Sequence, residues 1–169
     1  MFISDGVSGI EHATARQFPK YDHQLCAAHL KRSLLNRVRA EKRSELADDL
    51  KEVFQIMNKF WTQEDAMTAW KALCAKWSKS YPSFGPLGQK DRYQFYFSVL
   101  KLPPNVRRMT WTTNWVERLN RDYKRVLRMR GAMPNAKSVL ALLASAAIQK
   151  RTYDTPIHQL KEADSFDWI

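Results

Sequence analysis

The chain has 169 residues and carries 28 Lys or Arg against 17 Asp or Glu, a formal net charge of +11. Hydrophobic residues make up 44% of it, which excludes a disordered basic tail, and no stretch approaches the roughly eighteen apolar residues of a membrane-spanning helix. The basic charge predicts a nucleic-acid partner, with an anionic membrane surface as the main alternative. Two cysteines, Cys26 and Cys74, are too few for a disulfide framework and indicate a reducing cytoplasm.

Short elements are predicted at the start of the chain. Residues 1–4 have the pattern of a strand that runs into the turn dipeptide Asp5-Gly6. A three-residue strand cannot satisfy its own edges, so we expect the chain to begin within a larger fold. Helical spacing predicts a helix over residues 8–17, and a weak alternation predicts a short strand over residues 21–27.

The middle of the chain is predicted to be helical. The residues from Thr62 to Asp65 have the sequence of a helix N-terminus, and prolines and glycines over residues 82–88 predict a loop. Four stretches are assigned to helices, the last of them rich in Tyr and Phe: 29–39, 43–60, 63–79 and 89–100.

The last third contains two further predicted helices. Pro103-Pro104 ends the preceding helix, and residues 106–111 form a link that we expect to be extended. A helix over residues 114–129 is closed by Gly131. A final helix over 136–151 is capped by Asn135, and residues 152–169 form a weakly acidic tail. The expected buried stripe of the final helix comprises Val139, Leu140, Leu142, Leu143, Ala146 and Ala147.

Most of the positive charge surrounds a single glutamate. Residues 101–151 contain twelve Lys or Arg and only two acidic residues, Glu117 and Asp122. A basic surface attracts a polyanion, which would repel a lone carboxylate unless a metal ion lay between them. This combination is typical of a site that cuts phosphodiester bonds.

Glu117 has two interpretations. With Asn114 as N-cap, it occupies the third helical position, where its carboxylate can form a capping box without any further function. Alternatively, Glu117 is a metal ligand on the same helix face as Arg121, Lys124 and Arg128, which would hold a DNA backbone. The scarcity of acidic partners favours this second interpretation over a solvated helix face.

Asp5 and the Cys26-x-x-His29 motif also have alternatives. Asp5-Gly6 is a common turn dipeptide, but an aspartate at the end of a strand is also well placed to hold a divalent metal. Cys26 and His29 have metal-ligand spacing. A structural zinc site needs four ligands, and the remaining candidates lack paired spacing, so a buried Cys and a hydrogen-bonded His are favoured. Those remaining candidates are His12, His23 and Cys74.

Six tryptophans occur in the chain, and most of them fall on apolar helix faces, where core packing is the favoured role. Trp111 and Trp115 differ because they flank the proposed site at Glu117, where an aromatic ring could stack on a nucleic-acid base.

Five motifs, in this order, resemble bacterial insertion-sequence transposases of the Mutator type. The resemblance covers about residues 3–150, most of the chain. The motifs are Ser4-Asp5-Gly6, Phe18-Pro19, Gln24-Leu25-Cys26-Ala27-Ala28-His29, Thr112-Thr113-Asn114 through Glu117 to Arg121, and Arg130-Gly131-Ala132-Met133-Pro134-Asn135.

The resemblance implies an Asp-Asp-Glu (DDE) active site on an RNase H-like core. Asp5 would match the second catalytic aspartate, Glu117 the catalytic glutamate, and Cys26 and His29 the C-x-x-H motif. No residue matches the first aspartate or the region that recognises terminal inverted repeats, so we expect this chain to be a C-terminal part that is inactive alone. Its parts would be a core remnant (1–29), a helical insertion (30–100), the Glu-bearing basic helix with the final core helix (101–151) and a tail (152–169).

The same resemblance implies the cofactor and the partners. Carboxylates of such a site would bind two Mg²⁺ or Mn²⁺ ions, and the substrate would be double-stranded DNA of element ends and target. It also implies a cytoplasmic, nucleoid-associated bacterial protein without membrane contact, and it allows a homodimer of the full-length protein. The DNA-binding set would be Asn114, Arg118, Arg121, Lys124, Arg125, Arg128 and Arg130.

The sequence therefore predicts a mainly α fold with one or two short strands left from an α/β RNase H-like core. The expected function is that of the C-terminal part of a DNA transposase, which would cleave and transfer element DNA when complete. The first alternative is a non-enzymatic basic helical module that binds nucleic acid. A helical protein–protein or regulatory remnant with a solvated basic face is a third hypothesis.

Overall fold

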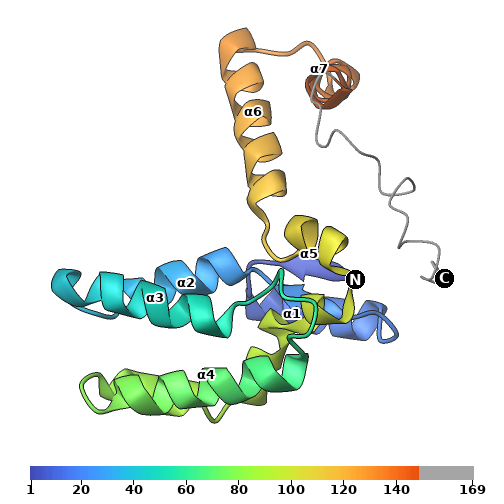
Figure 1. The fold of residues 1–169 in the computed structure, drawn as a ribbon. Coiled ribbons are helices and arrows are strands. Elements are labelled where there is room, and N and C mark those ends of the chain that lie inside the picture. The colour runs from blue at the N-terminus through green and yellow to red at the C-terminus, as the bar shows by residue number, and fades with distance from the viewer. Residues whose placement is uncertain (149–169) are drawn as a thin grey trace. The chain divides into compact units, whose positions relative to one another are not determined.

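A computed structural model describes residues 1–148 of the chain (Figure 1). The chain divides into two compact units, the first from Met1 to Thr113 and the second beginning at Asn114. The predicted tail over residues 152–169 and the last three residues of the predicted final helix lie outside the described residues.

The first unit contains two strands, five α-helices and four short 3-10 helices, and helices α6 and α7 belong to the second. The prediction of a mainly α fold with short strands is confirmed, whereas the RNase H-like origin of the strands stays a prediction. The elements are β1 (Phe2–Ser4), α1 (Ser8–Gln17), β2 (His23–Leu25), α2 (Ala27–Leu35), η1 (Ala40–Lys42), α3 (Arg43–Val53), α4 (Gln63–Ser78), η2 (Pro82–Leu87), η3 (Asp91–Tyr96), η4 (Ser98–Lys101), α5 (Pro104–Thr110), α6 (Asn114–Arg130) and α7 (Ala136–Ile148).

Strands β1 and β2 form a parallel pair connected through α1. The register places Ile3 opposite Gln24. The Gln24 side chain is buried; its amide N–H donates to the Tyr96 carbonyl (2.9 Å), and its Oε1 accepts from the Val99 N–H (2.7 Å). These bonds satisfy a buried polar side chain and join the strand pair to η3 and η4.

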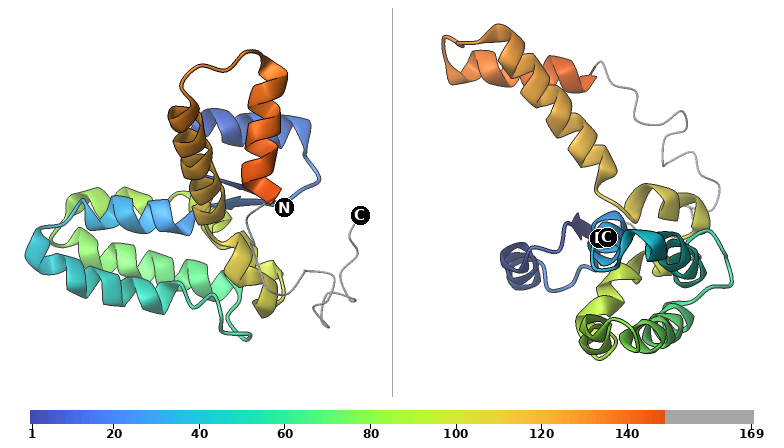
Figure 2. Two further views of the ribbon diagram at one scale, coloured as in Figure 1. Left: turned by 90° about the horizontal axis from the view of Figure 1, so that it is seen from above. Right: turned by 90° about the vertical axis from the view of Figure 1, so that its left-hand side faces the viewer.

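Helices α2, α3 and α4 lie side by side in the first unit and supply half of its buried core residues (Figure 2). In α3, Leu46, Leu50 and Val53 recur at helical spacing and are buried. In α4, Trp70 is fully buried and stacks on Tyr93 of η3 with ring centroids 4.7 Å apart. Full burial of each such side chain contributes about 1.5–3 kcal/mol, so the buried faces of these helices stabilise the first unit.

The predicted N-terminus of α4 is confirmed as a capping box. The Asp65 N–H donates to Thr62 Oγ1 (3.1 Å), and the Thr62 N–H donates to Asp65 Oδ2 (3.0 Å). Two backbone donors that the helix itself leaves unpaired are thereby satisfied.

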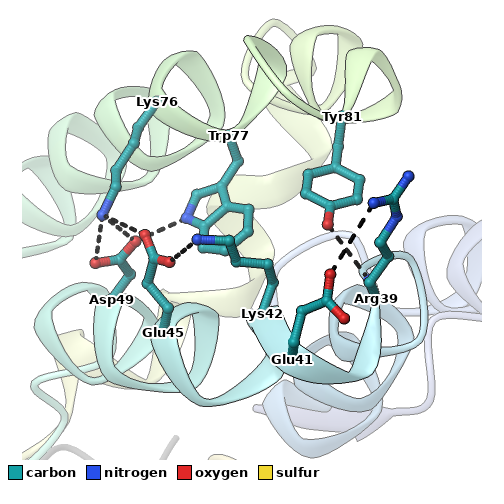
Figure 3. A network of polar contacts seen from close by, with 8 residues as sticks. All are labelled: Arg39, Glu41, Lys42, Glu45, Asp49, Lys76, Trp77 and Tyr81. Carbon is teal, nitrogen blue, oxygen red and sulfur yellow. Dashed lines mark hydrogen bonds and ion pairs between the residues drawn. The ribbon is translucent and has the colours of Figure 1, made fainter.

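A polar network connects α3 to α4 at the edge of the core (Figure 3). Asp49 accepts hydrogen bonds from Lys76 (2.7 and 2.9 Å) and from the indole N–H of Trp77 (2.7 Å). Burial by itself raises the pKa of Asp49, but the bonds from Lys76 and Trp77 outweigh it and hold the pKa below its ordinary value. The network therefore fixes the register between the two helices.

The extended link expected over residues 106–111 is instead helix α5. Pro104 stands in the first turn of this helix, where a backbone N–H has no acceptor within the helix and its absence costs nothing. The proline pair therefore ends one element and begins the next. The buried Arg107 donates to the carbonyls of Leu102 and Leu100 and to two further carbonyls, those of Ile56 and Asn58. Burial lowers the pKa of this guanidinium, which is held by neutral oxygens.

Two other helix predictions were wrong in extent. The helix expected over residues 43–60 ends at Val53, whose carbonyl accepts the indole N–H of Trp61 (3.2 Å). The stretch 89–100 forms two 3-10 helices, and the expected loop at 82–88 is also a 3-10 helix. In 3-10 geometry every third residue shares a face, and the aromatic and apolar spacing of Tyr93, Tyr96 and Val99, all buried, follows that period.

In the second unit, α6 and α7 pack against each other. Gly131 follows α6 with a φ of +66°, the left-handed conformation that glycine adopts readily, and Asn135 Oδ1 accepts the Ser138 N–H (2.9 Å) at the start of α7. Both predicted caps are confirmed. The stripe predicted for α7 is only partly buried: five of its six residues are half-buried, none is fully buried, and Leu140 is exposed. Within the described part of this unit, each of the two helices is covered only where it contacts the other.

Across residues 1–148, no helix is both long and apolar enough to cross a membrane.

Candidate active site

The structure gathers Asp5, Cys26 and His29 into one cluster, with a ligand atom of each within 4.8 Å of the others. Asp5 directly follows β1 and Cys26 directly follows β2. Because the carboxyl ends of parallel strands meet at the same edge of a sheet, these two residues lie close together. Cys26 is also the N-cap of α2 and His29 stands in its first turn, so the C-x-x-H spacing brings both side chains to one helix end.

The carbonyls of the residues before and after Asp5 both accept hydrogen bonds, whereas the Asp5 side chain is 45% exposed. One of its carboxylate oxygens lies 3.6 Å from Nδ1 of His29, whose side chain is 33% exposed. Gly6 follows with a φ of +79°, and its carbonyl accepts a hydrogen bond from Arg92 (2.7 Å). Arg92 also pairs with Glu11 of α1, which fixes the turn after Asp5 against η3.

The Arg92–Glu11 pair has a clear electrostatic consequence. The hydrogen bonds from Arg92 lower the pKa of Glu11, although partial burial opposes the effect. The same pair raises the pKa of Arg92, so both groups stay charged near neutral pH.

Cys26 is fully buried and connects the strand edge to the end of the first unit. Its N–H donates to the Ser4 carbonyl (2.8 Å). Its sulfur accepts the N–H of Thr113 (3.3 Å) and the hydroxyl of Thr113 (3.2 Å), and the neighbouring Ala27 N–H donates to the Trp111 carbonyl (3.1 Å). Residues 111–113 are therefore fastened to the start of α2.

Hydrogen bonding changes the chemistry of the Cys26 sulfur. Burial alone raises the pKa of Cys26, but the hydrogen bonds from Thr113 and His29 outweigh it and lower the pKa below its ordinary value. The other cysteine differs, because burial in the core raises the pKa of Cys74 to about 12. The two thiols are thus shifted in opposite directions, with the pKa of Cys26 lowered and that of Cys74 raised.

The other candidate ligands lie elsewhere. His23 Nε2 is 2.8 Å from the Ser4 hydroxyl, Cys74 packs inside the core, and His12 is exposed on α1. Sequence spacing had left Cys26 and His29 without a third ligand. The missing signal was the parallel pairing of residues 2–4 with residues 23–25, which brings in Asp5.

The donor set of this cluster is one carboxylate, one imidazole and one thiol. Mg²⁺ prefers oxygen ligands, keeps several waters and binds through one or two carboxylates, so Asp5 is the part of the cluster that suits it. Imidazole and thiolate instead suit a softer ion. The cluster therefore fits a divalent cation. Asp5 could serve as a ligand both for a hard ion such as Mg²⁺ and for a softer ion that also binds Cys26 and His29.

In the second unit, Glu117 lies in the first turn of α6 and lines one shallow hollow with four predicted DNA-binding cations. Within residues 1–148, none of these four forms an ion pair. Asn114 begins the helix and is exposed, and Arg118 and Arg130 do not line the hollow. The four cations of the hollow are Arg121, Lys124, Arg125 and Arg128.

Trp111 belongs to the first unit and packs half-buried against its core, with Nζ of Lys31 4.9 Å from its ring centroid. Asp5 and Glu117 belong to different compact units, so their pairing at one metal stays a prediction.

Comparison with known proteins identifies the family of this chain. Residues 1–154 match the model of the family described as Transposase, Mutator family. The chain belongs to this family of transposases.

Individual relatives are bacterial insertion-sequence transposases. The chain is 30% identical over 139 residues to the transposase for insertion sequence element IS1201 of Lactobacillus helveticus, covering 82% of this chain and 36% of that protein. It is 28% identical over 145 residues to the transposase for ISRM3 of Rhizobium meliloti, covering 83% and 34%. A third relative, the transposase for IS905 of Lactococcus lactis, is 23% identical over 82% of the chain and 34% of its own length. The chain thus spans about a third of the length of these relatives.

Proposed function

We propose that this chain forms the C-terminal part of the catalytic unit of a metal-dependent DNA transposase. In this proposal Asp5 and Glu117 are two of three carboxylates of a DDE site, and the cations of α6 hold the DNA backbone. The observation that carries it is the fastening of Thr113 to Cys26 at the strand edge that also bears Asp5. Membership of the Mutator transposase family supports the reaction class.

Covalent connectivity supports the pairing of the two carboxylates. Glu117 follows Thr113 by four residues, and four residues span at most about 14 Å however they are arranged. Since Thr113 contacts Cys26, and Cys26 clusters with Asp5, the chain itself limits the separation that the two carboxylates can have. The connectivity of the chain is therefore compatible with the proposed shared metal.

The residues have distinct roles in the proposed chemistry. Asp5 and Glu117 would supply oxygen ligands from a strand end and from the first turn of a helix. A Mg²⁺ or Mn²⁺ ion held by these carboxylates would supply the activation of a water or DNA 3′-hydroxyl and the charge that stabilises the leaving oxygen. The turn at Gly6, fixed through Arg92, would keep Asp5 in place while DNA binds.

The cations of α6 would bind phosphates without reading sequence. They lie on the same face as Glu117, so a backbone held by them would pass close to this carboxylate. With roughly six phosphate contacts, log affinity should fall against log salt with a slope near −5.

The 169 residues contain matches to two of the three carboxylates that the proposal requires. We therefore expect the chain by itself to bind DNA without cutting it. Incubation with nicked or hairpin DNA and Mg²⁺ or Mn²⁺ tests this expectation, and robust cleavage that depends on Glu117 would refute it.

Metal-directed cleavage of the polypeptide tests the pairing of Asp5 with Glu117. Fe²⁺ with ascorbate and peroxide cuts a protein chain next to the bound iron, so cuts are expected near both residues in the DNA-bound chain. Asp5→Asn should suppress the cuts near residue 117, whereas the exposed Asp91→Asn should not. Persistence of the cuts near residue 117 in Asp5→Asn would disprove a shared metal.

The non-enzymatic DNA-binding module stays as the second hypothesis, because the cations of the α6 hollow would serve it equally well. It predicts that Asp5→Asn and Glu117→Gln change neither metal-directed cutting nor any activity of a longer protein that carries the first aspartate. DNA affinity alone does not separate the two hypotheses.

A further inference from the structure

We propose that Asp5, Cys26 and His29 form a binding site for a thiophilic divalent cation of the Zn²⁺ class, separate in chemistry from the Mg²⁺ of the proposed reaction. The three side chains come from the end of β1, the end of β2 and the first turn of α2. Three different backbone segments thus converge on one point, with ligand atoms within 4.8 Å of one another.

The distances suit a four-coordinate ion. Around Zn²⁺, with bonds of about 2.0–2.3 Å, two ligand atoms of a tetrahedron lie roughly 3.3–3.8 Å apart. The carboxylate oxygen of Asp5 and Nδ1 of His29 are already 3.6 Å apart. Only a modest side-chain rotation would bring the Cys26 sulfur into the same shell, because both Asp5 and His29 are partly exposed and have room to rotate.

Thr113 supplies the support that a metal-bound sulfur requires. A thiolate ligand carries excess negative charge, and hydrogen bonds from outside the ligand shell stabilise and orient it. The Thr113 N–H and hydroxyl both donate to the Cys26 sulfur, at 3.3 and 3.2 Å. His29 also hydrogen-bonds to this sulfur, and a bound cation would take the place of its side-chain bond while the two bonds from Thr113 remain.

The site has three protein ligands and so an open fourth position, which water or a phosphate oxygen can occupy. Because Asp5 is shared with the proposed catalytic function, a bound thiophilic ion would compete there with Mg²⁺. This competition rests on the proposed function, but binding of the ion itself does not.

Cobalt serves as the spectroscopic probe. Co²⁺ replaces Zn²⁺ in tetrahedral sites and gives a near-ultraviolet thiolate-to-cobalt band when a cysteine is a ligand. Titration of the reduced full chain with Co²⁺ should produce this band at one ion per chain, and added Zn²⁺ should remove it. Absence of the band in the folded chain at excess Co²⁺ overturns the proposal.

Variants assign the ligands. Cys26→Ser should lose the band, and Asp5→Asn and His29→Ala should each weaken Co²⁺ affinity by roughly tenfold or more. Cys74→Ser and His12→Ala are the matched controls, since Cys74 is buried in the core and His12 is exposed on α1, and both should keep the band. Loss of the band in Cys74→Ser, or its retention in Cys26→Ser, contradicts the assignment.

Two further measurements keep the test decisive. Circular dichroism checks that each variant is folded; if Cys26→Ser does not fold, unchanged Co²⁺ affinity in both Asp5→Asn and His29→Ala still disproves the site. Glu117→Gln should leave Co²⁺ binding unchanged while abolishing the metal-directed cuts near residue 117. The two proposals can therefore fail independently.

Discussion

The sulfur of Cys26 accepts two hydrogen bonds from Thr113, a residue 87 positions later in the chain. The contact joins the end of β2 to the last residue of the first unit, directly before α6 begins. These two hydrogen bonds therefore fix the position of Thr113, four residues before Glu117, against the end of β2.

Removal of the Thr113 hydroxyl tests this contact. Thr113→Val keeps the branched shape but loses the hydroxyl bond to the buried Cys26 sulfur, so we expect the free energy of unfolding, measured by urea denaturation, to fall by about 1 kcal/mol. Thr112→Val is the control, since Thr112 is similarly buried and its hydroxyl has no hydrogen bond within residues 1–148. An equal loss in both variants would assign the effect to packing alone.

The Glu11–Arg92 pair predicts a pH-dependent stability. The folded pKa of Glu11 lies below its ordinary value of 4.5, so the pair stabilises the fold above that pH and the contribution is lost as pH falls through the lower folded pKa. At pH 7, Glu11→Gln should cost about 1 kcal/mol, a figure reduced for the 40% exposure of Arg92.

At pH values below the folded pKa of Glu11, wild type and Glu11→Gln should have the same stability. Glu52 is an exposed carboxylate in the last turn of α3 and serves as the control. Glu52→Gln should have the same stability as wild type already at pH 7, so lowering the pH should not change the difference between them. A Glu11→Gln difference that is constant with pH would show that charge is not its origin.

The basic face of α6 predicts a change in salt dependence. Neutralisation of Arg121, Lys124 and Arg128 to Gln should weaken DNA binding and reduce the slope of log affinity against log salt by about 3, because each phosphate that a cation neutralises releases about 0.9 counterion. Fluorescence anisotropy at several salt concentrations measures the slope.

The matched control removes the same charge from the first unit, at three exposed lysines that form no ion pair within residues 1–148: Lys71, Lys79 and Lys90. This variant should lower affinity slightly through net charge and leave the slope nearly unchanged. Equal slopes for both triple variants would show that α6 is not the DNA-binding surface.

The network between α3 and α4 predicts a stability cost for Asp49→Ala. The variant leaves the indole N–H of the buried Trp77 without its acceptor, which should cost about 1–2 kcal/mol in urea unfolding. Asp48→Ala removes only an exposed pair with Lys51 and should stay within about 0.5 kcal/mol of wild type. A similar small effect at both positions would mean that solvent replaces the Asp49 acceptor.

The sequence correctly predicted the features that depend only on neighbouring residues. The capping box at Thr62 and Asp65, the glycine after α6 and the bounds of α1 depend on residues within a few positions, so the sequence was enough. The aromatic stretch around Tyr93 and Tyr96 was misassigned because a period of three and a period of 3.6 differ little over so few residues.

The sequence by itself determined the family, the mainly helical class and the concentration of cations around Glu117, since motif order, apolar spacing and charge are properties of the chain. Only the tertiary structure decided that Asp5 joins Cys26 and His29 and that Thr113 holds the Cys26 sulfur. Parallel strand pairing and the return of the chain after 87 residues create these contacts. Side chains so far apart in sequence become neighbours only when burial of the whole core fixes the backbone between them.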